Sequence, residues 1–147
     1  QALVSKSSFG YARRRSQGFD FNRLSLLVAV LEKRIGLSLE AEDIFVNVAG
    51  GIKVEDPAAD LAVAAAIASA FRENKVLADT MVLGEIGLAG EIRSIAQPLL
   101  RIKEAEKLGF KFCLLPKTNV KNLNYKNGSL ELIAVSTLRE ALEAALR

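Results

Sequence analysis

Residues 44–70, IFVNVAGGIKVEDPAADLAVAAAIASA, predict the elements around which the rest of the chain is organised. The first five residues alternate apolar and polar side chains, which is typical of a half-buried β-strand. The glycine pair at 50–51 then indicates a turn. Asp56 stands directly before Pro57, so we expect it to cap a helix whose first turn tolerates the missing N–H of proline. That helix is rich in alanine over 58–70, and such small side chains let neighbouring backbones approach closely.

A strand that leads into a helix N-terminus often carries a nucleophile or binds an anion. The residues in that position here, Ala58 and Ala59, have only methyl side chains. Asp56 and Asp60 could form a pair of carboxylates instead, but at a helix start we favour their interaction with the positive end of the helix dipole. The stretch therefore predicts the frame of an active site without a reactive side chain.

Extended outward, the same reasoning predicts strands and helices along the whole chain. Asp20 is expected to cap one helix and Gly36 to end it, and GLAG at 87–90 is expected to turn a hairpin. Residues 7–18 are polar, so we expect a loop. The expected strands are 2–5, 44–48, 81–86, 91–95, 110–115 and 130–135; the expected helices are 21–35, 58–72, 97–107 and 137–146. Hairpins and crossovers together predict an α+β fold: one domain over residues 1–147, with helices packed on a mixed β-sheet.

Composition excludes several classes of function. The chain has 20 Lys+Arg against 17 Asp+Glu, no histidine and one cysteine. Without histidine there is no Ser-His or Cys-His catalysis and no credible zinc site, and no G-x-x-x-x-G-K-[ST] motif is present to hold a nucleotide. We therefore expect no cofactor in this chain.

Cys113 lies in an apolar run and is expected to be buried. No run is long enough to span a membrane, and the start at Gln1 within an apolar strand indicates a fragment of a longer protein.

Three motifs in order resemble the proteolytic domain of Lon proteases: DPAAD at 56–60, LGEIGLAGEIRSI at 83–95 and GFKFCLLP at 109–116. The similarity covers roughly residues 44–122. Lon enzymes use a dyad in which a lysine amine takes the proton of the serine nucleophile. In this sequence the serine position falls on Ala58, and the lysine position falls on Leu99 when the motifs are aligned without gaps. The resemblance therefore implies a Lon-like α+β domain that is not a peptidase.

A Lon-like domain without the dyad, with NVAGGIKV at 47–54 and three arginines at 13–15, resembles the C-terminal domain of the RadA (Sms) family of bacterial recombination and repair proteins. The resemblance implies a cytoplasmic parent protein with a zinc finger and a RecA-like ATPase core, neither of which this chain contains. ATP, magnesium and zinc would belong to those parts. It implies three partners: single-stranded or branched DNA, further subunits of a hexamer, and the RecA recombinase.

The best candidate for a binding site is the segment FGYARRR at 9–15. Arginine guanidinium groups match phosphate oxygens, and aromatic rings offer faces on which unpaired bases stack. Residues 1–23 hold five basic side chains and one acidic side chain, and this +4 exceeds the +3 of the whole chain. A second cluster of lysines at 117, 121 and 126 is a weaker candidate. The expected DNA-binding residues are Lys6, Phe9, Tyr11, Arg13, Arg14 and Arg15.

Other interpretations of this segment stay open, namely pairing with carboxylates of a neighbouring subunit and simple solvation. The expected function is to hold a hexamer together and to offer it a DNA-binding surface for ATP-dependent branch migration in homologous recombination. The alternative is a pseudo-protease that keeps the Lon groove and binds a peptide. DNA binding measured against peptide binding separates the two.

Overall fold

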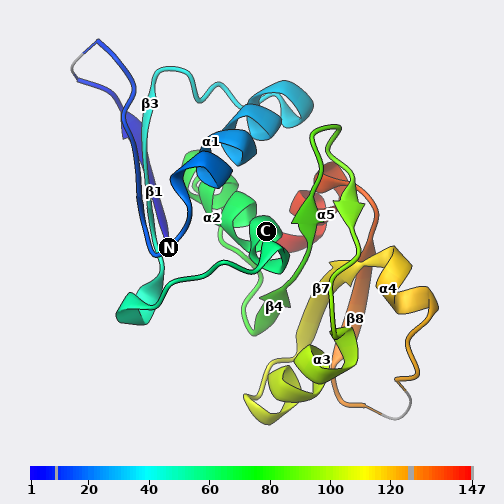
Figure 1. The fold of residues 1–147 in the computed structure, drawn as a ribbon. Helices are drawn as coiled ribbons and strands as arrows, with labels where there is room; N and C mark the ends of the chain where they lie inside the picture. The colour runs from blue at the N-terminus through cyan, green and yellow to red at the C-terminus, as the bar shows by residue number, and fades with distance from the viewer. Residues whose placement is uncertain (9, 126–127, 147) are drawn as a thin grey trace.

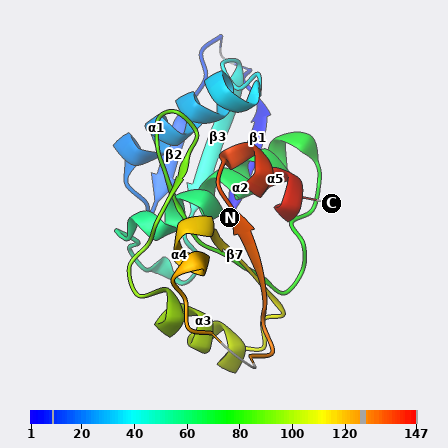
Figure 2. The same cartoon turned by 90° about the vertical axis from the view of Figure 1, so that its right-hand side faces the viewer.

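The computed structural model describes residues 1–8, 10–125 and 128–146 (Figure 1). The expected α+β class is confirmed, but the strands do not lie in one sheet. They form two three-stranded sheets and a short hairpin. Figure 2 shows the two sheets towards opposite ends of an elongated molecule, with the helix of residues 60–72 between them. Periodicity predicts which residues form strands, but it does not say which strands pair.

The first sheet has the order β1-β3-β2. Strand β1 (Ala2–Lys6) is antiparallel to the central strand β3 (Glu42–Asn47), and β2 (Arg14–Gln17) is parallel to it. The prediction of a loop throughout residues 7–18 is therefore wrong for β2. This edge strand has the sequence RRSQ and buries no apolar side chain, so it lacks the alternation that marks a half-buried strand.

Two helices cover one side of the first sheet (Figure 1). Helix α1 (Phe21–Val30) starts where the Asp20 carboxylate accepts a hydrogen bond from the Arg23 N–H at 2.7 Å, as predicted. It continues as one π-helical turn to Ile35, and Gly36 ends it with φ 82°. Helix α2 (Asp60–Arg72) follows a 3₁₀ turn over Pro57–Ala59. The side chains that pack between these helices and the sheet include Leu24, Leu27, Leu31, Ile44, Leu61 and Ile67.

The second sheet contains β4 (Thr80–Val82), β7 (Phe112–Pro116) and β8 (Glu131–Val135), all parallel. Helix α3 (Pro98–Lys107) packs on it around Ile102, Ala105 and Cys113. The short helix α4 (Lys117–Lys121) lies in the connection from β7 to β8. Helix α5 (Leu138–Ala145) packs against α2. Thr137 caps α5, as predicted. In the part of the chain described, no helix is both long and apolar enough to cross a membrane.

The single strand predicted over 81–86 is divided into two shorter strands, β4 and β5 (Glu85–Ile86). After β4, the Leu83 N–H donates to the Leu114 carbonyl of the second sheet at 2.8 Å. The next residue, Gly84, instead bonds to the start of α2: its N–H donates to the Ala58 carbonyl at 2.9 Å, and its carbonyl accepts from the Leu61 N–H at 3.0 Å. A Cβ atom on Gly84 would lie 2.8 Å from Ile92 Cγ2, so this close approach needs glycine. The hairpin of β5 (Glu85–Ile86) and β6 (Ile92–Arg93) follows.

Candidate functional site

Ala58, the residue at the expected nucleophile position, is enclosed by the fold. Its side chain is buried at 2% exposure. Its N–H donates to Asp56 Oδ1 at 2.9 Å, and its carbonyl accepts from Gly84. The methyl group is therefore packed inward, and both backbone groups are already hydrogen-bonded. This site offers neither a nucleophile nor a free backbone donor at Ala58.

The expected lysine position, Leu99, lies on the first turn of α3. It is half-buried and lines a pocket of about 840 Å³ together with Glu106 and Tyr125. The α3 side chain that contacts the 56–60 turn is Arg101, whose Nη2 lies 2.5 Å from Asp56 Oδ2. Residues two positions apart in an α-helix project on nearly opposite sides. Leu99 therefore points away from the side on which Arg101 meets the turn.

The two aspartates of the turn have separate arginine partners. Asp60 is completely buried, and Arg23 of α1 donates to it through both Nε (2.8 Å to Oδ1) and Nη2 (to Oδ2). The Ile86 N–H adds a third hydrogen bond at 3.1 Å. The hydrogen bond to Asp60 raises the pKa of Arg23. The Ala58 N–H and then Arg101 lower the pKa of Asp56. Each carboxylate is thus bound by its own arginine, which favours the structural interpretation of the pair.

Beside this turn lies a pocket of about 340 Å³ with side chains of both charges. Its lining includes Asp20, Arg23, Lys53, Glu55 and Asp56. Lys53 Nζ and Glu55 Oε1 form an exposed ion pair at 2.6 Å. Within the described ranges, no group of three acidic, cysteine or histidine side chains could hold a metal ion.

Arg13, the first arginine of the predicted binding segment, is bound to a buried aspartate of the first sheet. Asp43 on β3 is 1% exposed and accepts from the Arg13 N–H at 2.8 Å, from Nε at 2.9 Å and from Nη2 at 2.5 Å. The side-chain hydrogen bond from Arg13 lowers the pKa of Asp43. The guanidinium carbon also lies 5.7 Å from the centre of the Phe45 ring. Arg13 therefore serves to hold the start of β2 against β3.

The Arg14 side chain is also hydrogen-bonded within the fold, whereas no such bond is made by the Arg15 side chain among the described residues. Arg14 donates to the carbonyls of Glu42 at 2.5 Å and Leu39 at 3.0 Å, so it closes the loop before β3. Arg15 is exposed on β2, and no carboxylate of the described residues lies within ion-pair distance of it. The same is true of Lys6 at the end of β1.

The remaining predicted contacts lie around these strands. Tyr11 is 71% exposed in the segment that leads to β2. Phe9 lies outside the described residues, as does Lys126 of the second basic cluster. Lys117 and Lys121 are exposed at the two ends of α4. Of the predicted segment, Tyr11 and Arg15 thus face solvent, and Lys6 does so on the other outer strand, β1.

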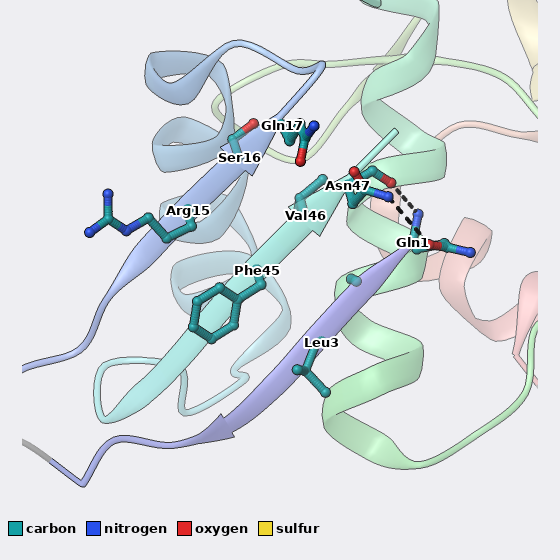
Figure 3. A pocket seen from close by; sticks show the side chains of 9 residues that line it. Gln1, Leu3, Arg15, Ser16, Gln17, Phe45, Val46 and Asn47 are labelled. Atoms are coloured by element: carbon teal, nitrogen blue, oxygen red, sulfur yellow. Dashed lines mark hydrogen bonds between the residues drawn. The ribbon is translucent and has the colours of Figure 1, made fainter. Parts of the chain in front are cut away.

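A pocket of about 500 Å³ lies on the side of the first sheet that faces away from α1 and α2 (Figure 3). Leu3, Phe45 and Arg15 form one row across its three strands, because Leu3 pairs with Phe45 and Arg15 pairs with Phe45. Sequence reasoning missed Phe45 as a surface residue. The signal was present, since the alternation of 44–48 places Phe45 opposite the buried Ile44 and Val46.

Comparison with known proteins adds two findings. Residues 23–119 match the family model described as subunit ChlI of Mg-chelatase. The chain is 47% identical over 146 residues to DNA repair protein RadA of Halalkalibacterium halodurans, 45% to that of Listeria monocytogenes and 46% to that of Bacillus subtilis. Each of these alignments covers 99% of this chain and 32% of the relative. The chain thus spans about a third of the length of these relatives.

Proposed function

This chain belongs to the ChlI family and is homologous to proteins named DNA repair protein RadA, and from this premise we propose that it is a non-proteolytic, DNA-binding scaffold domain of a RadA-type repair protein. The observation that carries the proposal is an exposed cation on the β2 edge of the first sheet, Arg15, which we call the cationic edge. A second exposed cation, Lys6, lies on the other outer strand, β1, and neither side chain has an ion-pair partner among the described residues. Exposed cations of this kind bind phosphate by releasing counterions, without regard to base sequence.

The lack of peptidase activity is supported by the turn at 56–60. The serine of a Lon-type dyad would have to replace a buried methyl group at Ala58, and the general base would have to come from Leu99. Arg101 and Arg23 instead neutralise the carboxylates there. We expect no serine-dependent cleavage of casein by this chain, nor by the Ala58→Ser variant, because a serine without its base is a weak nucleophile.

The scaffold part of the proposal concerns a six-fold ring. In such a ring one face of a subunit meets a different face of the next, so the interface is heterologous. The ring would bring several copies of the cationic edge around one DNA molecule and multiply a weak individual affinity. ATP-driven branch migration, with the magnesium and zinc that it requires, would be the work of the other two thirds of such a protein. RecA would be its partner in recombination.

Peptide binding remains the second candidate, because the pocket of about 340 Å³ lies beside the degenerate turn. It has donors and acceptors for a peptide backbone in Lys53, Glu55 and Asp56. The resemblance to Lon proteases is the reason to expect a peptide groove in this region. A peptide ligand would be held here independently of the cationic edge.

One measurement separates the two candidates. Fluorescence anisotropy of a labelled single-stranded oligonucleotide and of the matching duplex is recorded with this chain at low and at physiological salt. DNA binding that weakens with salt, and that is reduced in Arg15→Ala but not in Lys53→Ala, supports the proposal. Absence of DNA binding at both salt concentrations, with saturable binding of a peptide library that Lys53→Ala reduces, establishes the peptide-binding function instead.

A further inference from the structure

We propose that the open face of the first sheet is a platform on which unpaired DNA bases stack, with the Phe45 ring as the stacking surface and Arg15 as the adjacent phosphate contact. We define the open face by the row Leu3, Phe45 and Arg15 together with Asn47 and Gln17 in the next row. The inference rests on the proposed DNA-binding function. It adds the form of DNA that is bound and the side chain that recognises it.

The first argument is the position of Phe45. It lies on the central strand, half-buried, while its neighbours Ile44 and Val46 on the same strand are buried against the helices. Leu3 on one side of it is 61% exposed, and Arg15 on the other side is exposed. In Figure 1 both α1 and α2 lie on the other side of the sheet, and none of the described elements covers the open face. The part of the Phe45 ring that stays exposed on this open face is therefore accessible to a flat ligand.

The second argument is rigidity. The Arg13 guanidinium lies 5.7 Å from the centre of the Phe45 ring, and Asp43 holds that guanidinium by two side-chain hydrogen bonds. Strand β3 is itself hydrogen-bonded on both sides, to β1 and β2. Little conformational freedom is therefore lost when a base stacks on Phe45, which favours binding.

The third argument is the chemistry of the surrounding side chains. Asn47 and Gln17 lie opposite each other two residues along the strands from the row that contains Phe45, and both are exposed. Their amides can donate to and accept from the edge of a base that stacks on the ring. Arg15 supplies the positive charge that a phosphate requires. The pocket of about 500 Å³ includes all four of these residues (Figure 3).

These features select single strands. The faces of bases in a duplex are covered by their neighbours in the stack, so duplex DNA can contact Arg15 and Lys6 but not the Phe45 ring. We therefore expect that Phe45 contributes to the affinity for single strands and not to the affinity for duplex. Base stacking on an aromatic side chain tolerates any sequence, because every base has a π face.

The test exploits the absence of tryptophan from this chain. Phe45→Trp introduces a single fluorescent indole at the proposed platform. Leu108→Trp is the matched control, because Leu108 is 75% exposed at the end of α3, by the other sheet. We expect oligo(dT) to quench the Phe45→Trp variant in a saturable manner, at the concentrations where anisotropy reports binding. The same oligonucleotide should leave the fluorescence of Leu108→Trp unchanged, and duplex should leave that of Phe45→Trp unchanged.

A second variant tests affinity without a reporter. Phe45→Leu keeps an apolar side chain on β3 but removes the aromatic face. We expect it to weaken oligo(dT) binding by about 5- to 100-fold and duplex binding by less than about two-fold. Thermal unfolding of each variant confirms that the fold is kept.

The outcomes distinguish this inference from the proposed function. If DNA binds and Phe45→Leu and Phe45→Trp show no single-strand effect, the platform is wrong while the cationic edge stands. If no DNA binds at either salt concentration, both are wrong. If the fluorescence of Phe45→Trp changes with protein concentration and not with DNA, the open face is an interface between copies of this chain, and the platform is again wrong.

Discussion

Arg23 of α1 donates two side-chain hydrogen bonds to the fully buried Asp60 of α2, while the Arg23 side chain itself stays 31% exposed. Asp60 also accepts from the Ile86 N–H of β5. One carboxylate therefore connects two helices and the hairpin. The negative charge also lies at the N-terminus of α2, where the helix dipole favours it.

Removing one member of this pair should be costly. We expect Arg23→Met to lower the free energy of unfolding by roughly 3 kcal/mol, at the lower end for a broken buried ion pair because Arg23 is partly exposed. The double variant Arg23→Met with Asp60→Leu should recover part of that loss, since no charge is then left unpaired. Urea unfolding of the wild type, both single variants and the double variant measures the coupling. Additive losses would show that the two side chains act independently.

The three arginines at 13–15 should differ in their effects. The logarithm of the DNA-binding constant falls with the logarithm of the salt concentration. From the sequence alone, replacing all three arginines by alanine is expected to flatten this slope by roughly two to three units. The structure predicts that Arg15→Ala accounts for about 0.7 to 0.9 of a unit with no change in thermal midpoint. Arg13→Ala should instead lower the midpoint, because Asp43 loses its partner. Arg72→Ala, at the exposed end of α2, is the control for general charge loss.

Acid should weaken the contact between β2 and β3. Arg13 lowers the pKa of Asp43 below its ordinary 3.8. A carboxylate with a lowered folded pKa stabilises the fold above its unfolded pKa, and this contribution is lost as the pH falls through the folded pKa. The stability difference between wild type and Asp43→Asn should therefore be constant from about pH 8 to 5 and shrink below about pH 4. Unfolding curves across this range check it, and a difference that grows in acid would contradict it.

The alanine-rich helix has one face that does not tolerate larger side chains. Ala65 is 2% exposed, whereas Ala62 on the same helix is exposed. We expect Ala65→Leu to destabilise the fold by ~1–3 kcal/mol through overpacking and Ala62→Leu to have little effect. Thermal midpoints of the two variants give the comparison. Equal midpoints would show that the buried face of α2 lies elsewhere.

Cys113 should serve as a reporter of global unfolding. It is fully buried between α3 and the second sheet, and burial raises the pKa of its thiol to about 12. At about pH 8 we expect a thiol reagent to label the native protein only as fast as it unfolds, and to label it at once in denaturant. The labelling rate should therefore rise in the destabilised Ala65→Leu variant. Rapid labelling of the native wild type would contradict the burial of this thiol.

The sequence was informative where a local rule decides the structure. Asp20 and Gly36 mark the limits of the first helix because capping and left-handed backbone are properties of single residues. Burial of Leu24 and Cys113 follows from apolar character alone. Strand β2 could not be predicted, because Arg14 and its neighbours are held in the sheet by a partner strand distant in sequence. The same is true of the aspartate at 43, whose arginine lies thirty positions away.

At the candidate site, residue identity was more informative than geometry. The absence of a nucleophile at Ala58 was evident from the sequence. Its position under Gly84, and the approach of Arg101 rather than Leu99 to the turn, required the packing of α3 on the rest of the fold. Phe45 was within reach of sequence reasoning, because strand alternation separates it from Ile44. What the alternation does not reveal is which face of a strand the helices cover.

The step from Leu83 to Gly84 gives the molecule a mechanical property. Leu83 is hydrogen-bonded to the second sheet, whereas Gly84 is hydrogen-bonded to Ala58 and Leu61 at the start of α2. Two consecutive residues therefore belong to different halves of the molecule, one built around the second sheet and the other around the first sheet with α1 and α2. A single peptide bond has almost no slack. A movement that pulls one half away from the other at this point would therefore have to break backbone hydrogen bonds. A force that separates the two halves acts directly on the hydrogen bonds of Leu83 and Gly84, which tie them together at this point.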